Sequence, residues 1–158
     1  MPYEIERRFL ADRYYDYTAF NSTRIIQAYI STDPLRAVRV RMDGDKAFIT
    51  IKGGSMSGGA MRYEWEQEIS RKDARELMFL RSGHLVEKTR YRIPAERHTF
   101  EVDCFSGANE GLVVAEVELT RIDEPFERPI WLGEEITGEM KYSNLALSVT
   151  PFGTWGKH

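Results

Sequence analysis

The sequence has a single cysteine, Cys104, so no disulfide bond can form within the chain. One unpaired cysteine suits a reducing compartment, and we expect a cytoplasmic protein. No stretch approaches the roughly 20 consecutive apolar residues that a membrane-spanning helix needs. The first residues also lack the basic and apolar runs of a secretory signal. We therefore expect neither membrane insertion nor export.

The sequence also lacks an excess of basic charge and the ligand motifs of zinc sites. The formal net charge is −3, so there is no global surplus of Lys and Arg to hold a nucleic acid. The three histidines, His84, His98 and His158, are scattered and form no His or Cys ligand motif. These absences argue against a nucleic-acid partner and against a zinc site.

What the sequence does contain is the composition of a folded protein, with 42% hydrophobic and 30% charged residues in a chain of 158. This length suits one domain, 1–158, with one hydrophobic core. Most of the chain alternates apolar and polar residues, which is the period of a β-strand. The alternation predicts eight strands, at 3–10, 24–31, 37–42, 46–52, 61–69, 84–93, 99–105 and 112–121.

Two of the connections between these strands have clear local signals. The segment Asp43-Gly44-Asp45 predicts a hairpin, because glycine readily adopts the positive φ of a tight turn. Residues 53–60 are rich in Gly and Ser and predict a mobile loop. This loop has no Gly-Lys-Ser/Thr ending, so a hairpin loop is the better interpretation than a phosphate-binding loop.

Helices are few. Ser70 followed by Asp73 is a capping-box arrangement, which predicts a helix that Gly83 can end. A second, short helix is expected at 140–149, before Pro151. The fold class is therefore mainly β with a few helices (α+β), in an antiparallel arrangement.

The informative feature is the set of charges that alternates with the apolar residues. Like charges repeat at every second position, as in the pairs Arg39 and Arg41, Glu64 and Glu66, and Glu116 and Glu118. A polar face in water explains any one such strand, but like charges on one strand face repel each other. Carboxylate clusters indicate a divalent cation, and basic clusters indicate an anion with several oxygens. The period alone does not decide which face is inside. Charged faces that point inward would give a closed barrel a polar lumen.

The first strand carries a motif. The segment Glu4-Ile5-Glu6-Arg7-Arg8 resembles the Glu-x-Glu-x-Lys signature of the CYTH superfamily, also called the triphosphate tunnel metalloenzymes. Arg8 stands where the family has Lys, and arginine can still hold phosphate, in a bidentate manner. Further segments resemble the family in the same order along nearly the whole chain, at 27–30, 38–41, 49–53, 63–68, 87–91, 101–103, 115–118 and 141–144.

This resemblance implies a closed antiparallel eight-stranded β-barrel, a tunnel whose lumen is lined by opposing acidic and basic residues. It implies hydrolysis of a small-molecule triphosphate, foremost inorganic tripolyphosphate to pyrophosphate and phosphate. Mg²⁺ or Mn²⁺ is the expected cofactor, because carboxylate ligands favour hard cations. The implied metal ligands are Glu4, Glu6, Asp103, Glu116 and Glu118. The implied phosphate-binding residues are Arg8, Arg39, Arg41, Lys52, Lys88 and Arg90. Lys88 is also the candidate to position the attacking water or neutralise the terminal phosphoryl group, with Glu64 and Glu66 as further candidate catalytic residues.

Alternatives stay open at this point. An adenylate cyclase of the same fold would share the metal and phosphate sites, but it needs a base-recognition pocket that the sequence does not identify. A thiamine triphosphatase needs an aromatic or acidic site for the thiazolium ring, for which Tyr29, Tyr63 and Trp65 are available. A non-catalytic polyphosphate-binding module would gain nothing from repelling carboxylates. A homodimer is compatible with the sequence, and no nucleic-acid or membrane partner is expected.

Overall fold

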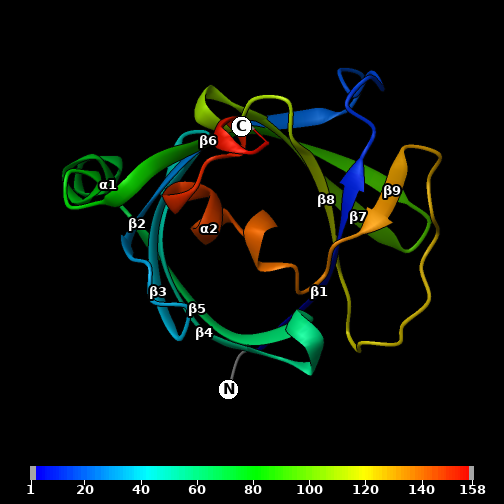
Figure 1. Cartoon of the computed structure of the whole chain (residues 1–158), viewed down its shortest axis with the longest axis horizontal. Helices are drawn as coiled ribbons and strands as arrows, with labels where there is room; N and C mark the ends of the chain where they lie inside the picture. Colours follow the sequence, from blue (N-terminus) through cyan, green and yellow to red (C-terminus); the bar gives the residue numbers. More distant parts are fainter. Residues whose placement is uncertain (1–2, 157–158) are drawn as a thin grey trace.

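The computed structural model describes residues 3–156 as a sheet that closes on itself around a central lumen (Figure 1). The strands are β1 (Tyr3–Ala11), β2 (Asn21–Ser31), β3 (Arg36–Asp43), β4 (Lys46–Met56), β5 (Met61–Ile69), β6 (Ser82–Ala95), β7 (His98–Ser106), β8 (Val113–Glu118) and β9 (Leu132–Glu135). Their order is β5-β4-β3-β2-β6-β7-β8-β1-β9, and β5 also pairs with β1. The predicted closed antiparallel eight-stranded barrel is therefore confirmed, with β9 added outside the closed ring.

Closure of the barrel depends on β1, which pairs with three other strands. Its first residues, Tyr3 to Ile5, pair with β5, and Glu6 to Leu10 pair with β8. Near its end, Phe9 and Ala11 pair with β9. The pairing of β1 with β5 is thus only a few residues long. Further along β1, the strand β9 pairs with it instead. The sequence alternation did not predict β9.

The hairpin prediction is confirmed. Asp43 pairs with Lys46 around a two-residue turn in which Gly44 has a φ of 62°. The prediction of a loop at 53–60 is wrong for its first half, because β4 continues through Met56. A bulge between Lys52 and Ser55 shifts the register, and pairing resumes with Ser55 opposite Arg62 and Met56 opposite Met61. The 3₁₀ turn η1 (Ser57–Gly59) and Ala60 connect the two strands.

The first helix, α1 (Arg71–Met78), begins as expected: the Ser70 hydroxyl accepts a hydrogen bond from the Asp73 N–H at 3.0 Å. It ends earlier than predicted. Gly83 lies at the start of β6 with a φ of 80°, and a Cβ there would collide with the Ser148 carbonyl oxygen. The glycine is therefore needed for a close approach between two segments rather than for ending the helix.

The helix predicted at 140–149 is divided in two, η3 (Met140–Tyr142) and α2 (Asn144–Val149). The division falls at Ser143, whose hydroxyl accepts from the Ala146 N–H at 3.1 Å and so caps a new helix. Two other short turns are η2 (Gly107–Asn109) and η4 (Phe152–Thr154). Within residues 3–156, every helix is too short or too polar to cross a bilayer.

The apolar faces of the strands point outward and are covered there. Helix α1 packs on β2, β3 and β4, where Ala74 and Met78 meet Ala28, Val40 and Ala47. On the opposite side, segments that follow β1 and β8 cover the barrel. Their cluster is made of Phe9, Tyr17, Phe100, Val102, Val117 and Trp131, with smaller neighbours. Full burial of one large apolar side chain stabilises a fold by roughly 1.5–3 kcal/mol. Most of the buried apolar side chains lie in these two outer layers, which therefore provide most of the core.

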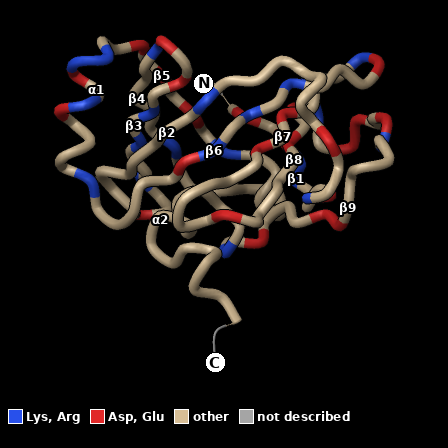
Figure 2. The backbone as a smooth tube through the Cα atoms, turned by 90° about the horizontal axis from the view of Figure 1, so that it is seen from above, with Lys and Arg blue, Asp and Glu red and all other residues tan. Residues whose placement is uncertain are grey.

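One end of the lumen is apolar and closed. Helix α2 lies across that end, below the strands in Figure 2 and in front of them in Figure 1. Leu147 of α2 packs with Val86, Phe105, Val114 and Ile136 in a buried cluster, which we call the plug. Val86, Phe105 and Val114 share their strand faces with Lys88, Asp103 and Glu116. The inner face of the barrel is thus apolar at one end and charged beyond it.

Candidate active site

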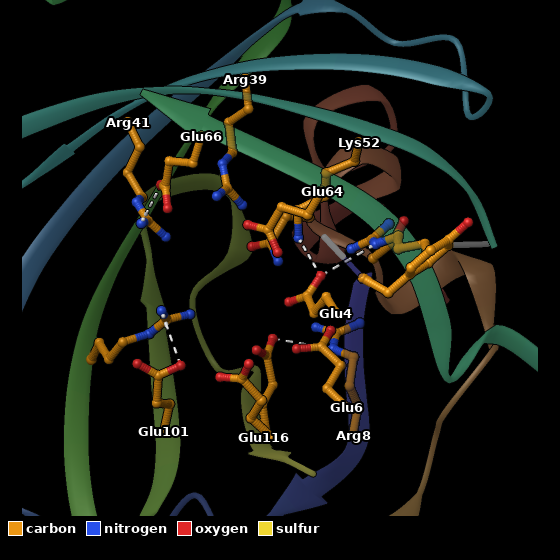
Figure 3. A pocket seen from close by; sticks show the side chains of 16 residues that line it. Glu4, Glu6, Arg8, Arg39, Arg41, Lys52, Glu64, Glu66, Glu101 and Glu116 are labelled. Carbon is orange, nitrogen blue, oxygen red and sulfur yellow. Dashed lines mark hydrogen bonds and ion pairs between the residues drawn. The ribbon is translucent and has the colours of Figure 1, made fainter. Parts of the chain in front are cut away.

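The charged part of the lumen encloses a cavity of about 420 Å³ (Figure 3). Side chains from opposite walls of the barrel point into it. Among the lining residues within 3–156, only Tyr3, Ser143 and Asn144 are uncharged. The charged lining residues are Glu4, Glu6, Arg8, Arg39, Arg41, Lys52, Arg62, Glu64, Glu66, Arg90, Glu101, Glu116 and Glu118. Alternation on the strands places these side chains inward, because the opposite faces are covered by the outer core.

One wall, which we call the basic wall, carries Arg39 and Arg41 of β3 and Lys52 of β4. Arg39 is buried, and in the described part of the chain it has no ion pair. Its Nη2 lies 3.4 Å from the Thr50 hydroxyl, and its Nε has no hydrogen-bond partner. Arg41 donates to Glu66 at 3.0 Å. Burial, together with the positive charges of Arg39 and Arg90, lowers the pKa of Arg41. This wall therefore has more positive charge and more donors than its own partners satisfy.

The opposite wall, which we call the acidic wall, carries the glutamates of β1, β7 and β8. Burial raises the pKa of Glu6 well above its usual range, and the carboxylates of Glu116 and Glu4 raise it further. Burial also raises the pKa of Glu101. The charge of Arg90 lowers this pKa, and the charges of Glu116 and Asp103 raise it further. Both shifts come first from burial, and the neighbouring carboxylates add to them.

Two glutamates of the acidic wall are instead paired with cations. Lys52 donates to Glu4 at 3.0 Å, and the Arg62 Nε lies 3.6 Å from the same oxygen. Arg8 donates to Glu116 through Nε at 3.2 Å. Burial opposes ionisation of Glu4 and Glu116, but the neighbouring cations outweigh it and hold the pKa of both below its usual value. These carboxylates are ionised and already oriented toward the lumen.

A buried charge cluster joins Arg90 and Asn144 of the cavity lining to Lys88 and Asp103, which do not line the cavity. The Lys88 ammonium contacts Asp103 at 2.8 Å and donates to the Asn144 side chain at 2.9 Å. Arg90 donates to both oxygens of Asp103, at 2.8 and 2.9 Å. Burial lowers the pKa of Lys88 to about 8, against the opposing charge of Asp103. Of the residues predicted for the site, only Lys88 and Asp103 lie beneath the cavity.

The other predicted residues are brought together around the cavity. Glu64 and Glu66 of β5 line it beside the basic wall, and Glu66 also accepts from Thr50 at 3.2 Å. Burial raises the pKa of Glu64 although Lys52 opposes the shift. Glu118 completes the acidic wall on β8.

The residues that line the cavity but were not predicted for the site from the sequence are Tyr3, Arg62, Glu101, Ser143 and Asn144. Arg62 could have been found, because it shares its strand parity with Glu64 and Glu66. Ser143 and Asn144 reach the cavity because α2 folds back across the end of the barrel. No local sequence pattern predicts this position of α2. Tyr63 and Trp65 have the opposite parity on β5 and are absent from the lining of this cavity, whereas Tyr29 lines a smaller adjoining cavity of about 250 Å³.

The donor set fits a hard divalent cation. Carboxylate oxygens are the ligands that Mg²⁺ and Mn²⁺ favour. Burial is the main cause that raises the pKa of the Glu6 carboxyl, and repulsion from the Glu116 and Glu4 carboxylates adds to it. A bound cation would relieve this repulsion. As the side chains stand in residues 3–156, no three acidic, His or Cys side chains are close enough together to hold one ion. Part of such a coordination shell would therefore be supplied by water or by substrate oxygens.

Comparison with known proteins agrees with this geometry. The chain matches the CYTH domain over residues 2–147. It is 39% identical over 150 residues to an inorganic triphosphatase of Acetivibrio thermocellus, which covers 94% of this chain and 95% of that protein. It is 35% identical over 153 residues to an inorganic triphosphatase of Nitrosomonas europaea, and this alignment covers 93% of the chain and 97% of that protein. A solved structure of an inorganic triphosphatase superposes on this chain with a TM-score of 0.67 at 33% identity. The superposition covers 93% of this chain and 98% of that one. The matched region includes every strand that lines the cavity.

Proposed function

Because the chain belongs to the CYTH domain family, we propose that it hydrolyses inorganic tripolyphosphate to pyrophosphate and phosphate, with Mg²⁺ or Mn²⁺ in the charged cavity. The whole chain, 1–158, would act as one tunnel domain. The observation that carries the proposal is the opposite imbalance of the two walls. The basic wall has buried donors without acceptors, and the acidic wall has carboxyl groups whose ionisation is suppressed. A metal-bound polyphosphate supplies the anion that one wall needs and the cation that the other needs.

The phosphate chain would be held by the basic wall. Arg39 and Arg41 offer charge-assisted hydrogen bonds, and their forked guanidinium groups suit phosphate oxygens. Lys52 and Arg8 are held by Glu4 and Glu116, so each would have to exchange a carboxylate for a phosphate oxygen. Arg90 also lines the cavity, and its guanidinium is held in place by Asp103. These cations would stabilise the charge that develops when water attacks the terminal phosphorus.

The metal would be held on the acidic wall, by Glu4, Glu6, Glu116 and Glu118. When bound, a divalent cation withdraws charge from phosphate oxygens and lowers the pKa of a bound water. Asp103 is paired with both Lys88 and Arg90, so we assign it the orientation of Arg90 and only indirect support of the metal. Glu64 and Glu66 would order water or hold the neighbouring cations, as Glu66 holds Arg41.

Lys88 would support the terminal phosphoryl group from beneath the floor. Its ammonium has 1% exposure and is fixed by Asp103 and Asn144, so direct contact with substrate requires it to leave one of these partners. With a pKa of about 8 it is mainly protonated at neutral pH. The positive charge is therefore available where the phosphoryl group would be transferred.

The test is phosphate release from tripolyphosphate with and without Mg²⁺ or Mn²⁺, with ATP measured in parallel for phosphate, pyrophosphate and cyclic AMP. We expect strong metal-dependent cleavage of tripolyphosphate and weaker cleavage of ATP. Cyclic AMP from ATP without cleavage of tripolyphosphate would show a cyclase instead. Binding of tripolyphosphate without any turnover would show a binding module and would contradict the proposal.

A further inference from the structure

Gln27 of β2 is a buried polar side chain that has no role in the proposed site. It has no exposed surface, and among residues 3–156 neither its amide oxygen nor its amide nitrogen has a hydrogen-bond partner. Buried side-chain amides are nearly always hydrogen-bonded, so an exception of this kind calls for a specific reason. The neighbours of Gln27 provide one.

Gln27 lies at the junction of the charged cavity and the plug. Its neighbours along β2, Ile26 and Ala28, pack outward in the cluster beneath α1, so Gln27 faces inward. Across the sheet, it is paired on one side with Arg41 of the basic wall and on the other with Val86 of the plug. Directly paired residues of antiparallel strands have Cβ atoms roughly 4.5–5.5 Å apart, so Gln27 and Arg41 are immediate neighbours.

Arg41 has the complementary deficiency. Its Nε is buried and has no hydrogen-bond partner in the described part of the chain, and an Asp43 carboxylate oxygen lies 4.0 Å from it. The guanidinium is instead held by a single bond from Nη2 to Glu66, at 3.0 Å. A donor that lacks an acceptor and an acceptor that lacks a donor thus occupy paired positions of adjacent strands.

Within the proposed triphosphatase function, on which this inference rests, we propose that Gln27 is the positioning residue for Arg41. Phosphate oxygens in the cavity compete with Glu66 for the guanidinium. Once Arg41 turns from Glu66, the amide oxygen of Gln27 accepts from its Nε. That bond fixes the plane of the guanidinium and leaves both terminal nitrogens for the phosphate, which is the forked geometry that arginine uses on phosphate groups.

A double-mutant cycle tests the pairing. Gln27→Leu removes the amide and nearly preserves its volume, and we expect kcat/KM for tripolyphosphate to fall about tenfold, as for one lost hydrogen bond to a charged group. Because the effect passes through Arg41, Gln27→Leu should change nothing further when Arg41→Ala is already present. The same substitution at Gln67, exposed on the outer face of β5, is the matched control and should leave activity unchanged.

Two additional readouts separate this role from a structural one and from failure of the proposed function. The melting temperature of Gln27→Leu without ligand should stay the same or rise, because two unsatisfied polar groups leave the interior. Calorimetric binding of tripolyphosphate is measured on the same four proteins of the cycle. If the wild type binds but does not cleave, the proposed function fails, and the binding cycle still decides the pairing. Equal losses from Gln27→Leu with and without the Arg41 side chain, or no loss at all, would overturn the inference.

Discussion

The basic wall and the acidic wall of the lumen are built from the same kind of strand but are unbalanced in opposite ways. Arg39 and Arg41 carry buried nitrogens without acceptors, whereas Glu6 and Glu101 are carboxyl groups whose ionisation burial disfavours. The pairs that do form, such as Lys52 with Glu4, neutralise only part of each wall. A closed barrel fixes the positions of its strands, so the two walls cannot collapse onto each other. The remaining imbalance is what a ligand of mixed charge can satisfy.

Removing the unpaired cation of the basic wall should have the largest effect. We expect Arg39→Ala to lower kcat/KM for tripolyphosphate by about 10²–10³-fold, the loss typical of one preorganised donor to transition-state charge. Because Arg39 has no ion pair within the described residues, the melting temperature should hardly change. Arg75→Ala, on the exposed face of α1, is the matched control. Full activity of Arg39→Ala would refute the assignment of the phosphate clamp.

Removing the excess charge of the acidic wall should separate activity from stability. Glu6→Gln takes away a proposed metal ligand and also the repulsion with Glu116 and Glu4. Activity should fall about 100-fold, while the melting temperature without metal should rise by about 2–4 °C, which corresponds to about 1 kcal/mol in a domain of this size. Steady-state kinetics over a range of Mn²⁺ concentrations and thermal unfolding in a chelator measure the two effects. The control is Glu134→Gln on the exposed face of β9. A loss of both activity and stability would mean that Glu6 is structural.

A paired cation of the basic wall should behave differently from Arg39. Lys52→Met keeps the aliphatic stem but leaves Glu4 with Arg62 as its remaining ion-pair partner among the described residues. We expect a loss of about 1–3 kcal/mol in the free energy of unfolding, the range for a buried polar group that loses its partner. Urea denaturation of Lys52→Met and Arg39→Ala, without metal or phosphate, makes the comparison. Equal stability of the two variants would contradict the distinction between paired and unpaired cations.

The smallest expected effect is the pH dependence of the acidic wall. Glu6 has a pKa well above the ordinary value of 4.5, so at intermediate pH the folded protein keeps a proton that the unfolded chain has released. The contribution of Glu6 to the free energy of unfolding therefore falls as pH rises from 4.5 through its raised pKa. The stability advantage of Glu6→Gln over the wild type should grow across the same window. Chemical denaturation in a chelator at several pH values measures this difference, and a difference independent of pH would be inconsistent with the raised pKa.

Much of this arrangement was predictable from the sequence. The period of two gave eight strands, and Met61–Ile69 has the predicted bounds. The repeated like charges pointed to an inward charged face, because such repetition is unfavourable unless opposite charges or ligands lie between the side chains. Every site residue that the resemblance to the CYTH superfamily implied lines the cavity, apart from Lys88 and Asp103.

What the sequence did not reveal depends on long-range packing. Lys88 has the same parity as Arg90 but lies beneath the cavity, because α2 and the plug bury the part of β6 that precedes Arg90. Val86 and Val114 mark on their own strands where the charged alternation becomes apolar, which in the sequence is a signal of a closed end. The 53–60 segment was misjudged because glycine and serine are also compatible with a bulged strand, as β4 shows after Lys52.

The closure of the barrel at β1 also has a consequence for the order in which the protein is made. Glu4 lies opposite Arg62, and Glu6 lies opposite Glu118, so the first strand to be synthesised pairs with strands that follow it by more than a third and by more than two thirds of the chain. Pairing over such separations is intrinsically slow. A growing chain that has not yet reached β8 carries the glutamates of β1 but no acidic wall. Divalent cation and polyphosphate should therefore not change the rate of the early folding steps. They should stabilise only the finished barrel against unfolding, because they bind the native state alone.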